Sequence, residues 1–499
     1  MRALGIVLLV AAALLVAAPG QWAEAAIAGA RLLPQVATPP AGPLPWLHVE
    51  HPAGRTPFIA DPAGRRVTLR GVVAAGLVDY WSGTDPAAPA PAPHWPVGAA
   101  AYAGRRCPAN DVTIWIPPLC RNDLDEMRGL NVQILRLALS WSLLEPELGE
   151  YSAEYEDRVA QVVGWAAQEH VYVILDMHQN GFSRAIGRAD PRHLPLPGGA
   201  AVSLNDHDGA PSWATFTDGL PSEKFAGQRE VNPAVLEAAT NFWLNRAQIQ
   251  DRYIHAVARL ASRFKDDSTV IGYSLFNEPW PGWVPPPLFE DDLLFPFYRR
   301  LIDALTGTRD GIPCPFGLPY LPACGYPDLN VHANHQLYFV ESGLVREVTD
   351  FPTHLPLPLT AYPNVVLGLH AYTHIYTLDR ILLGADPNTS TWPPFDQSYW
   401  WGEAEARQLG AALFVSEYGS DPGNDGRLLT LQVAEQRRHQ VGATLWVWKQ
   451  SCGSGPWGLY DGVVQPGGPC AYDQPAPDTG SKPQNGPLRP GRAALALTP

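Results

Sequence analysis

The sequence predicts a (β/α)8 barrel, and three observations indicate this fold. Eight apolar runs of strand length follow one another along the chain, and segments of helix length separate most of them. Hydrophobic residues make up 46% of the 499 residues, which is enough for a sizeable core. Polar and aromatic residues recur near the C-terminal ends of the runs. An open doubly wound sheet is the alternative, but no Gly-rich phosphate-binding fingerprint follows any run.

The N-terminus has the pattern of a secretory signal peptide. Arg2 precedes an apolar run at 3–18, and Ala23-Glu-Ala25 offers a cleavage site. We therefore expect residues 1–25 to be removed and the protein to be secreted. A retained membrane anchor is the alternative, because the run falls just short of spanning length. Residues 26–65, rich in Ala, Pro and Gly, are expected to pack on the barrel or to be irregular.

The catalytic barrel is expected over residues 66–472. Its strands are predicted at 66–73, 132–139, 171–178, 271–278, 336–341, 364–370, 413–417 and 442–448. Helices are predicted at 122–129, 153–169 and 234–265, with a long polar loop over 180–232. Four prolines in 351–363 leave the helix after the fifth strand poorly marked. The Pro/Gly-rich tail at 473–499 is expected to be irregular.

The cysteines and the net charge restrict the function classes. Six cysteines in a chain expected to be secreted predict disulfides, although six allow 15 pairings. Local staples of long loops are the simplest arrangement, with the candidate pairs Cys107 and Cys120, Cys314 and Cys324, and Cys452 and Cys470. The absence of a Cys-x-x-Cys spacing argues against a structural zinc. The net charge of −14, spread along the chain, argues against a nucleic-acid partner.

The polar residues at the strand ends are the candidate site residues, because functional groups of such barrels gather at that face. They are Arg136, Asp176, His178, Asn180, Asn277, Glu278, Glu341, His370, Tyr372, Glu417, Trp446 and Trp448. Taken singly, each has a structural alternative. Arg136 could be a buried ion-pair residue, His178 a core histidine and Trp446 part of the core.

Glu278 and Glu417 are the candidate catalytic pair. Retaining glycoside hydrolysis needs two carboxyl groups about 5–5.5 Å apart, one as acid/base and one as nucleophile. Arg136 and Tyr372 are suitable donors to hold the nucleophile ionised. Asn277 is predicted to contact the sugar 2-hydroxyl, and Trp448 to provide a platform for the sugar ring.

Four of these segments together resemble glycoside hydrolase family 5, the cellulase-like retaining β-glycosidases. The segments are Leu-Phe-Asn277-Glu278-Pro279, Leu-Asp176-Met-His178-Gln179, Leu-His370-Ala-Tyr372 and Val-Ser-Glu417-Tyr-Gly. The resemblance spans about residues 65–460. It implies that Glu278 is the acid/base and Glu417 the nucleophile. It further implies accessory roles for Arg136, His178, Asn277, His370, Tyr372 and Trp448, with no cofactor.

Within that family the chain looks most like the endoglycoceramidase branch, which releases an intact glycan from ceramide. Asp176-Met-His-Gln-Asn180 and Trp446-Val-Trp-Lys-Gln-Ser-Cys452 carry this likeness. Members typically have an acidic residue where Asn180 stands, and a lysine where this chain has Gly76-Leu-Val-Asp-Tyr80. They also commonly carry a C-terminal β-sandwich, for which the segment after Trp448 is too short. The glycan contacts and the substrate are therefore expected to differ.

Several alternative functions follow from the same residues. A carbohydrate or glycolipid substrate is expected, with transient contact to a membrane surface through a lipid substrate; the oligomeric state is open. A β-glucosidase or glucanase acting on soluble or polymeric glucosides is the main alternative. A non-catalytic sugar-binding barrel is disfavoured, because both glutamates are intact. A metal-dependent hydrolase would use histidines such as His332 with His335, or His370 with His374, but hydrogen bonding to site residues or a place in a loop suits them better.

Overall fold

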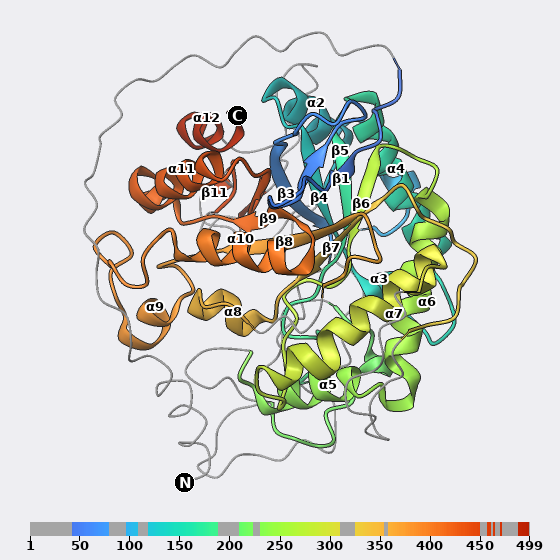
Figure 1. Cartoon of the computed structure of the whole chain (residues 1–499). Helices are drawn as coiled ribbons and strands as arrows, with labels where there is room; N and C mark the ends of the chain where they lie inside the picture. Colours follow the sequence, from blue (N-terminus) through green and yellow to red (C-terminus); the bar gives the residue numbers. More distant parts are fainter. Residues whose placement is uncertain are drawn as a thin grey trace. The chain divides into compact units, whose positions relative to one another are not determined.

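Eight parallel strands close into a barrel in the computed structural model (Figure 1). The structure describes residues 42–78, 96–107, 118–187, 209–222, 230–309, 325–353, 358–449, 457–460, 463–464, 470–471 and 488–498. The barrel strands are β3 (Arg70–Leu77), β4 (Ile134–Leu139), β5 (Tyr172–Met177), β6 (Val270–Ser274), β7 (Leu337–Glu341), β8 (Val365–Ala371), β9 (Ala412–Tyr418) and β10 (Ala443–Leu445). They lie in chain order, and β10 closes the barrel on β3. The predicted fold class is confirmed.

Helices follow the strands and cover the outside of the barrel (Figure 1). They are α2 (Arg121–Gly129), α3 (Trp141–Leu144), α4 (Ala153–Gln168), α5 (Pro233–Trp243), α6 (Ile249–Phe264), α7 (Phe295–Thr306), α8 (Leu344–Thr349), α9 (Leu378–Leu383), α10 (Gln397–Leu409), α11 (Thr430–Arg438) and α12 (Pro490–Leu497). Short 3-10 turns lie at Ala99–Tyr102, Ser212–Ala214, Arg246–Gln248 and Pro422–Asn424, and π-helical turns at Glu290–Leu294 and Asp425–Leu429. Among the described helices, none is both long and apolar enough to cross a membrane.

The first strand begins four residues later than the sequence suggested. Arg66 bridges to Ala60, and the Val67 N–H donates to the Ile59 carbonyl at 2.9 Å. Residues 66–67 therefore pair with the N-terminal segment, and only from Arg70 does the chain pair with β4 and β10. The predicted apolar run therefore contains a barrel strand, but its first residues pair with the N-terminal segment and not with the barrel.

The segment before the barrel closes the barrel's N-terminal end. Strands β1 (His48–Glu50) and β2 (Phe58–Ala60) form an antiparallel pair. Buried Leu47, Val49 and Ile59 pack with apolar side chains from the beginnings of the barrel strands, including Ile134 and Leu337. This part of the extension is therefore ordered and belongs to the core.

The predicted helix at 234–265 is two helices. Asn232 caps α5 by accepting the Ala234 N–H at 3.0 Å, and Pro233 occupies the first turn. Asn245, Ala247 and Gln248 then take left-handed backbone angles with φ of 54°, 50° and 65°. Left-handed residues end a helix, so α6 starts afresh at Ile249.

The C-terminal tail contains a helix, which corrects the expectation of an irregular segment. Pro490 stands in the first turn of α12, and Ala493, Ala496 and Leu497 are buried in the main core. Arg492 pairs with Asp425 and donates to the Ser420 carbonyl at 2.7 Å. The small β11 (Val463–Val464) and β12 (Cys470–Ala471) form an antiparallel pair before it.

One of the three expected disulfides lies within the described side chains. Cys107 and Cys120 are bonded, with a Cα–Cα distance of 5.2 Å. The bond joins the segment at 96–107 to the start of α2. The pairs Cys314–Cys324 and Cys452–Cys470 fall outside the described side chains.

Candidate active site

Arg136 is the centre of a buried polar network inside the barrel. It lies on β4, is fully buried, and its Nη2 is 2.9 Å from Asp176 Oδ1, from Glu341 Oε1 and from Asn277 Oδ1. Its Nη1 donates to Glu417 Oε1. Burial alone lowers the pKa of an arginine, but these carboxylates outweigh burial and raise the pKa of Arg136 above its usual value. The guanidinium therefore stays charged and holds the ends of four strands in register.

Glu417 and Glu278 lie at this network, at the ends of β9 and of the segment after β6, two strands that are separated by β7 and β8. Glu417 lies on β9, and its Oε2 accepts the Tyr372 hydroxyl at 2.9 Å. Glu278 lies four residues beyond β6, where its backbone has a φ of 42°, and its N–H donates to Glu341 Oε2 at 2.8 Å. A non-glycine residue in this left-handed region is strained, so Glu341 stabilises an otherwise unfavourable backbone.

The two candidate catalytic carboxyls are close together. An oxygen of Glu278, a ring nitrogen of His370 and an oxygen of Glu417 all lie within 4.8 Å of one another. His370 Nδ1 is 3.1 Å from Glu278 Oε1 and 3.7 Å from Glu417 Oε2. Inverting glycosidases keep their carboxyls about 6.5–9.5 Å apart to admit a water, whereas retaining ones hold them at about 5–5.5 Å. The spacing here fits the second arrangement.

Burial and His370 govern the protonation of the pair. Burial raises the pKa of Glu417 above that of an ordinary glutamate, although the charges of His370 and Arg136 oppose this rise. Burial acts in the same direction on Glu278, but the hydrogen bond and the charge of His370 outweigh it, so the pKa of Glu278 lies below its usual value. A charged His370 thus favours ionised Glu278, and the proton donor depends on the state of this histidine.

His178 and Trp446 form one wall of the site. His178 Nδ1 is 2.8 Å from Asp176 Oδ2, which fixes the ring. The half-buried indole of Trp446 stacks on that ring, with centroids 5.5 Å apart and planes 12° apart. Trp446 also packs against the apolar cluster that contains Tyr372, which donates to Glu417.

Trp448, in contrast, does not line this wall. Its side chain is buried in the main core, its Nε1 donates to Asp123 Oδ1 at 2.9 Å, and its ring packs on Tyr460. Trp446, which the sequence left as a core candidate, is instead the tryptophan that stacks on His178 at the site. The platform role predicted for Trp448 has no support from this buried position, and β10 ends at Leu445, before both tryptophans.

Asn277 connects the loops that follow β5 and β6. Its Oδ1 accepts from Arg136, and its Nδ2 donates to the Gln179 carbonyl at 2.9 Å. Gln179 returns two hydrogen bonds, from its Nε2 to the carbonyls of Asn277 and Glu278 at 2.8 and 3.0 Å. Asn180, next in the chain, is half-buried. The contact of Asn277 with a sugar hydroxyl stays a prediction.

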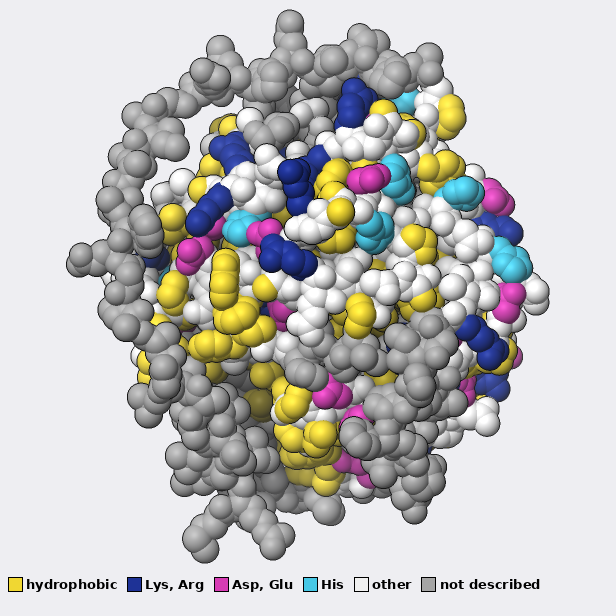
Figure 2. Space-filling model, viewed as in Figure 1, with side chains coloured by type: hydrophobic (Ala, Val, Ile, Leu, Met, Phe, Trp, Pro, Cys, Tyr) yellow, Lys and Arg dark blue, Asp and Glu magenta, His cyan; other side chains and the backbone are white. Residues whose placement is uncertain are grey.

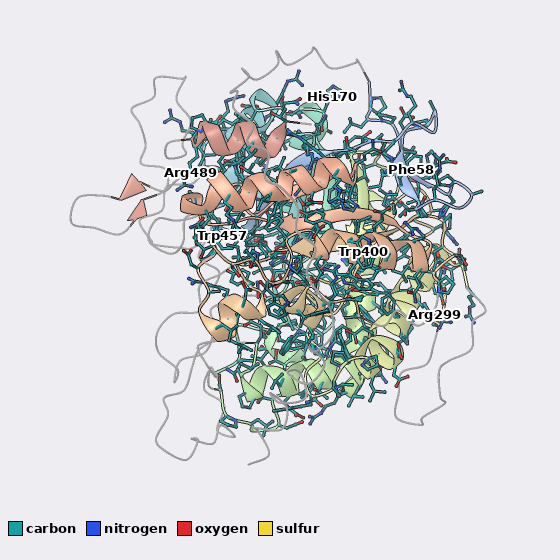
Figure 3. The ribbon with its side chains drawn as sticks, turned by 60° about the vertical axis from the view of Figure 1, so that its left-hand side comes forward. Phe58, His170, Arg299, Trp400, Trp457 and Arg489 are labelled. Atoms are coloured by element: carbon teal, nitrogen blue, oxygen red, sulfur yellow. A yellow bond between two sulfur atoms is a disulfide. The ribbon has the colours of Figure 1, made fainter. Side chains whose placement is uncertain are left out.

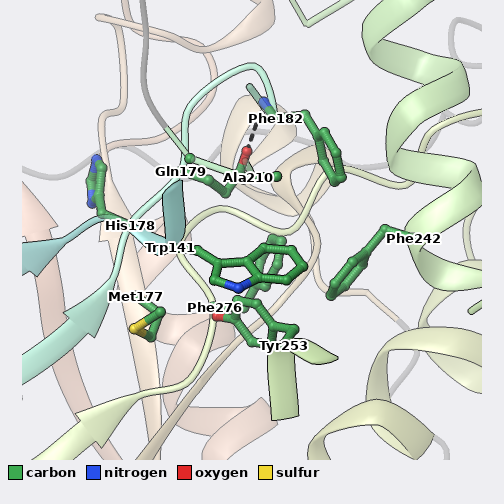
Figure 4. A pocket seen from close by; sticks show the side chains of 10 residues that line it. Trp141, Met177, His178, Gln179, Phe182, Ala210, Phe242, Tyr253 and Phe276 are labelled. Atoms are coloured by element: carbon green, nitrogen blue, oxygen red, sulfur yellow. Dashed lines mark hydrogen bonds between the residues drawn. The ribbon is translucent and has the colours of Figure 1, made fainter. Parts of the chain in front are cut away.

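An apolar pocket supports the loop that carries His178 and Gln179 (Figure 4). Its lining includes Trp141, Tyr253, Phe242 and Phe276. The ring centroids of Trp141 and Tyr253 are 5.2 Å apart, and so are those of Phe242 and Phe276. Gln179 Oε1 accepts the Phe182 N–H at 3.0 Å, which is the hydrogen bond drawn in Figure 4. Aromatic packing of this kind keeps the loop rigid behind the site.

Two residues of the network were missed or undervalued in the sequence. Glu341 ends β7, as expected, but it contacts the backbone of Glu278, Arg136 and, at 3.3 Å, His370 Nε2. Glu347, on α8, lies with Oε2 3.7 Å from His370 Nδ1. A glutamate on a short helix carries no strand-end signal, so no sequence pattern pointed to Glu347.

Two groups of buried side chains have the spacing of metal ligands, namely Glu278 with His370 and Glu417, and Glu341 with Glu347 and His370. Arg136 already forms ion pairs with Glu341 and with Glu417. A bound cation would have to lie against this guanidinium, so the donor sets do not fit a metal ion. A third group, at Cys107, Cys120 and Asp123, includes the disulfide.

The loop after β8 presents apolar side chains beside the site. Tyr376 is half-exposed and stacks on Trp457, with centroids 5.5 Å apart, and Trp457 contacts Tyr372. Leu382 and Leu383 on α9 are 60% and 76% exposed. Figure 3 shows Trp457 near Arg489, whose Nη1 donates to the carbonyl of Gly458 at 2.6 Å.

Polar groups lie beneath this apolar surface. Asp379, on the first turn of α9, is buried and accepts from Thr377 and Ser390 at 2.6 Å; its other contact is His374 Nδ1 at 2.8 Å. The helix therefore buries its carboxylate and exposes its leucines, which reverses the usual arrangement of a surface helix. On the face shown in Figure 2, by contrast, charges of both signs are interspersed.

Comparisons with known proteins agree with this geometry. The family model described as cellulase (glycosyl hydrolase family 5) matches residues 104–305. An endoglycoceramidase of Cyanea nozakii is 28% identical over 173 residues, which cover 32% of this chain and 33% of the relative. A glucosylceramidase of Cryptococcus neoformans var. grubii is 26% identical over 260 residues, covering 45% and 32%. The matches thus span about a third of the length of these curated relatives.

Among solved structures, an endogalactoceramidase is similar over most of both chains. It has a TM-score of 0.67 and 26% identity, and the superposition covers 91% of this chain and 85% of that one. An endo-glycoceramidase II from Rhodococcus sp. has a TM-score of 0.59 and 24% identity, covering 83% and 79%, which bears on the fold alone.

Proposed function

We propose that this chain is a retaining β-glycosidase of glycosyl hydrolase family 5, similar to the endoglycoceramidases; the family match at residues 104–305 and the similar endoglycoceramidase and endogalactoceramidase support this. The observation that carries the proposal is the close approach of Glu278 and Glu417, with carboxyl oxygens within 4.8 Å of each other. This spacing leaves no room for a water between a carboxylate and the anomeric carbon, so direct attack is favoured.

Glu417 is the nucleophile in this proposal. Arg136 and the Tyr372 hydroxyl each donate to one of its carboxylate oxygens and so orient them. Glu417 attacks the anomeric carbon, the glycosidic bond breaks, and Glu278 transfers its proton to the departing oxygen. A water, deprotonated by Glu278, then cleaves the glycosyl–Glu417 ester.

His370 supports the change of role of Glu278. When Glu278 is ionised, after the first step, an N–H of His370 stabilises its carboxylate. Trp446 replaces Trp448 as the platform for the sugar ring, because its indole stacks on His178 and packs against the apolar cluster that contains Tyr372.

Stereochemistry tests the mechanism. Proton NMR at the start of hydrolysis of an aryl β-glycoside should show the β-anomer as the first product. Glu417→Ala should abolish turnover. Formation of the α-anomer first, or full activity in Glu417→Ala, would reject the mechanism.

We further propose a β-linked glycolipid as the substrate, with transient contact to a membrane surface. The support is the exposed apolar side chains of Tyr376, which is connected to the site through Trp457 and Tyr372, and of Leu382 and Leu383 farther along the same segment, together with relatives that are named for ceramide-linked glycans. A secreted enzyme suits such a substrate, and we propose that residues 1–25 direct secretion.

Substrate profiling separates this proposal from the alternative, a glucosidase or glucanase on soluble β-glucosides. A short glycosphingolipid in detergent micelles and cello-oligosaccharides should be compared under the same conditions. We expect a higher kcat/KM on the glycolipid, and a selective loss of that activity in Leu382→Ser with Leu383→Ser. Leu148→Ser, at an exposed leucine elsewhere, is the matched control. Cleavage of the oligosaccharides alone would contradict the glycolipid proposal.

A further inference from the structure

His370 is surrounded by four carboxyl groups. Its Nδ1 is 3.1 Å from Glu278 Oε1 and 3.7 Å from both Glu347 Oε2 and Glu417 Oε2, and its Nε2 is 3.3 Å from Glu341 Oε1. The ring is fully buried. A neutral imidazole has one N–H, whereas an imidazolium has two and can serve both Glu278 and Glu341. An N–H on each nitrogen, facing Glu278 and Glu341, is therefore present only while His370 is charged, with the Glu341 contact an ion pair without hydrogen-bond geometry.

Glu347 contacts this ring from helix α8 and is not one of the two candidate catalytic glutamates. It lies on α8 and is 5% exposed, and its Oε2 has no hydrogen-bond partner among the described residues. Burial of a carboxylate oxygen that lacks a hydrogen bond is costly and favours the neutral acid. Burial correspondingly raises the pKa of Glu347 well above its usual value, with His370 opposing the rise.

We propose that Glu347 is a positioning residue that keeps His370 protonated as the pH rises, so that its Nδ1–H remains directed at Glu278. The inference rests on the proposed function of Glu278 as acid/base. Loss of the Glu347 proton creates a carboxylate beside Nδ1, and that carboxylate retains the proton on the imidazole.

The other charges around His370 do not replace this contribution. Arg136 lies against Glu341 and Glu417 and partly neutralises both, and the His178 ring is paired with Asp176. Glu278 changes its own charge in every catalytic cycle. Of the four carboxyls, Glu347 is thus the one whose charge is neither balanced by Arg136 nor altered by the reaction.

Glu347→Gln tests the proposal, because the amide has nearly the same shape and cannot ionise. We expect an unchanged KM and an alkaline limb of kcat moved by about one pH unit toward higher pH, because a neutral His370 no longer favours ionised Glu278. Glu347→Met, which fills similar volume, should give the same shift if the amide disturbs the fold. Glu405→Gln is the control, since this buried glutamate pairs with Arg346 instead of His370.

Titration of His370 by NMR with labelled histidine gives a second readout that needs no turnover. The pKa of His370 should fall in Glu347→Gln and stay unchanged in Glu405→Gln. An unchanged pKa of His370, or a uniform loss of kcat with both limbs in place, would overturn the proposal. A wild-type protein without glycosidase activity would instead refute the proposed function, while the titration would still decide the role of Glu347.

Discussion

At the residue scale, the site depends on buried charges that balance one another. Arg136 contacts Asp176, Glu341 and Glu417, and His370 lies among Glu278, Glu341 and Glu347. Inside a protein such charges interact strongly, and each unpaired one would be costly. The same balance that holds the side chains in place therefore sets which carboxyl carries the proton.

Substitutions of the two tryptophans after β10 should have different effects, one on activity and the other on stability. We expect Trp446→Ala to lower kcat/KM by about tenfold or more, because the sugar loses its aromatic platform, with little change in Tm. Trp448→Phe should instead destabilise the fold by about 1–2 kcal/mol, because it removes the hydrogen bond to Asp123. Steady-state kinetics and urea unfolding of both variants measure this, and the opposite pattern would restore Trp448 as the platform.

Most of the site could be predicted from the sequence, but the roles of these two tryptophans could not. The strand-end positions of Glu278, Glu417, Arg136 and His370 followed from apolar runs, because a parallel barrel brings such ends to one face. The choice between Trp446 and Trp448 depended on where β10 ends. No local pattern gives that point, since the chain leaves the sheet within an apolar run.

At the element scale, segments that are not part of the alternating strands and helices of the barrel pack against it and stabilise it. The β1–β2 hairpin fills its N-terminal end, and α12 packs beside the segment that follows Glu417. The eight strands could be predicted from their apolar runs. The hairpin strands, of three residues each, and α12, within a Pro/Gly-rich tail, carry too little periodicity for prediction.

Arg492 tests the contribution of α12. Arg492→Ala removes the partner of Asp425 and of the Ser420 carbonyl. We expect a loss of about 2–3 kcal/mol in the free energy of unfolding, below the cost of a fully buried pair because Asp425 is partly exposed. Arg407→Ala, which breaks an exposed pair with Glu403, should change it by about 0.5 kcal/mol or less. Equal effects of the two substitutions would show that α12 adds no more than a surface contact.

At the scale of the whole molecule, buried carboxyls make stability depend on pH in two opposite directions. Glu341 has a pKa lowered to about 2 by the charges of His370 and Arg136, which outweigh burial. Its contribution is present above the unfolded pKa of 4.5 and is lost as the pH falls toward 2. Asp350 has a pKa raised to about 6 by burial, so its contribution is present below pH 3.8 and is lost as the pH rises through 6.

Asp350→Asn isolates the second of these contributions. The amide cannot ionise, so the variant should lack the decline of about 2 kcal/mol that Asp350 adds between pH 4 and 7. Urea unfolding of both proteins at these two pH values measures the difference. Parallel pH dependence in wild type and variant would contradict the assignment to Asp350.

The most direct test of the central claim is covalent trapping of the nucleophile. An activated aryl β-glycoside fluorinated at C2 forms the glycosyl-enzyme readily but slows its hydrolysis. We predict that mass spectrometry of the digested protein finds one added sugar, on the peptide that contains Glu417, and none in Glu417→Ala. A sugar on another residue, or no adduct while the aglycone is released, would contradict double displacement through Glu417.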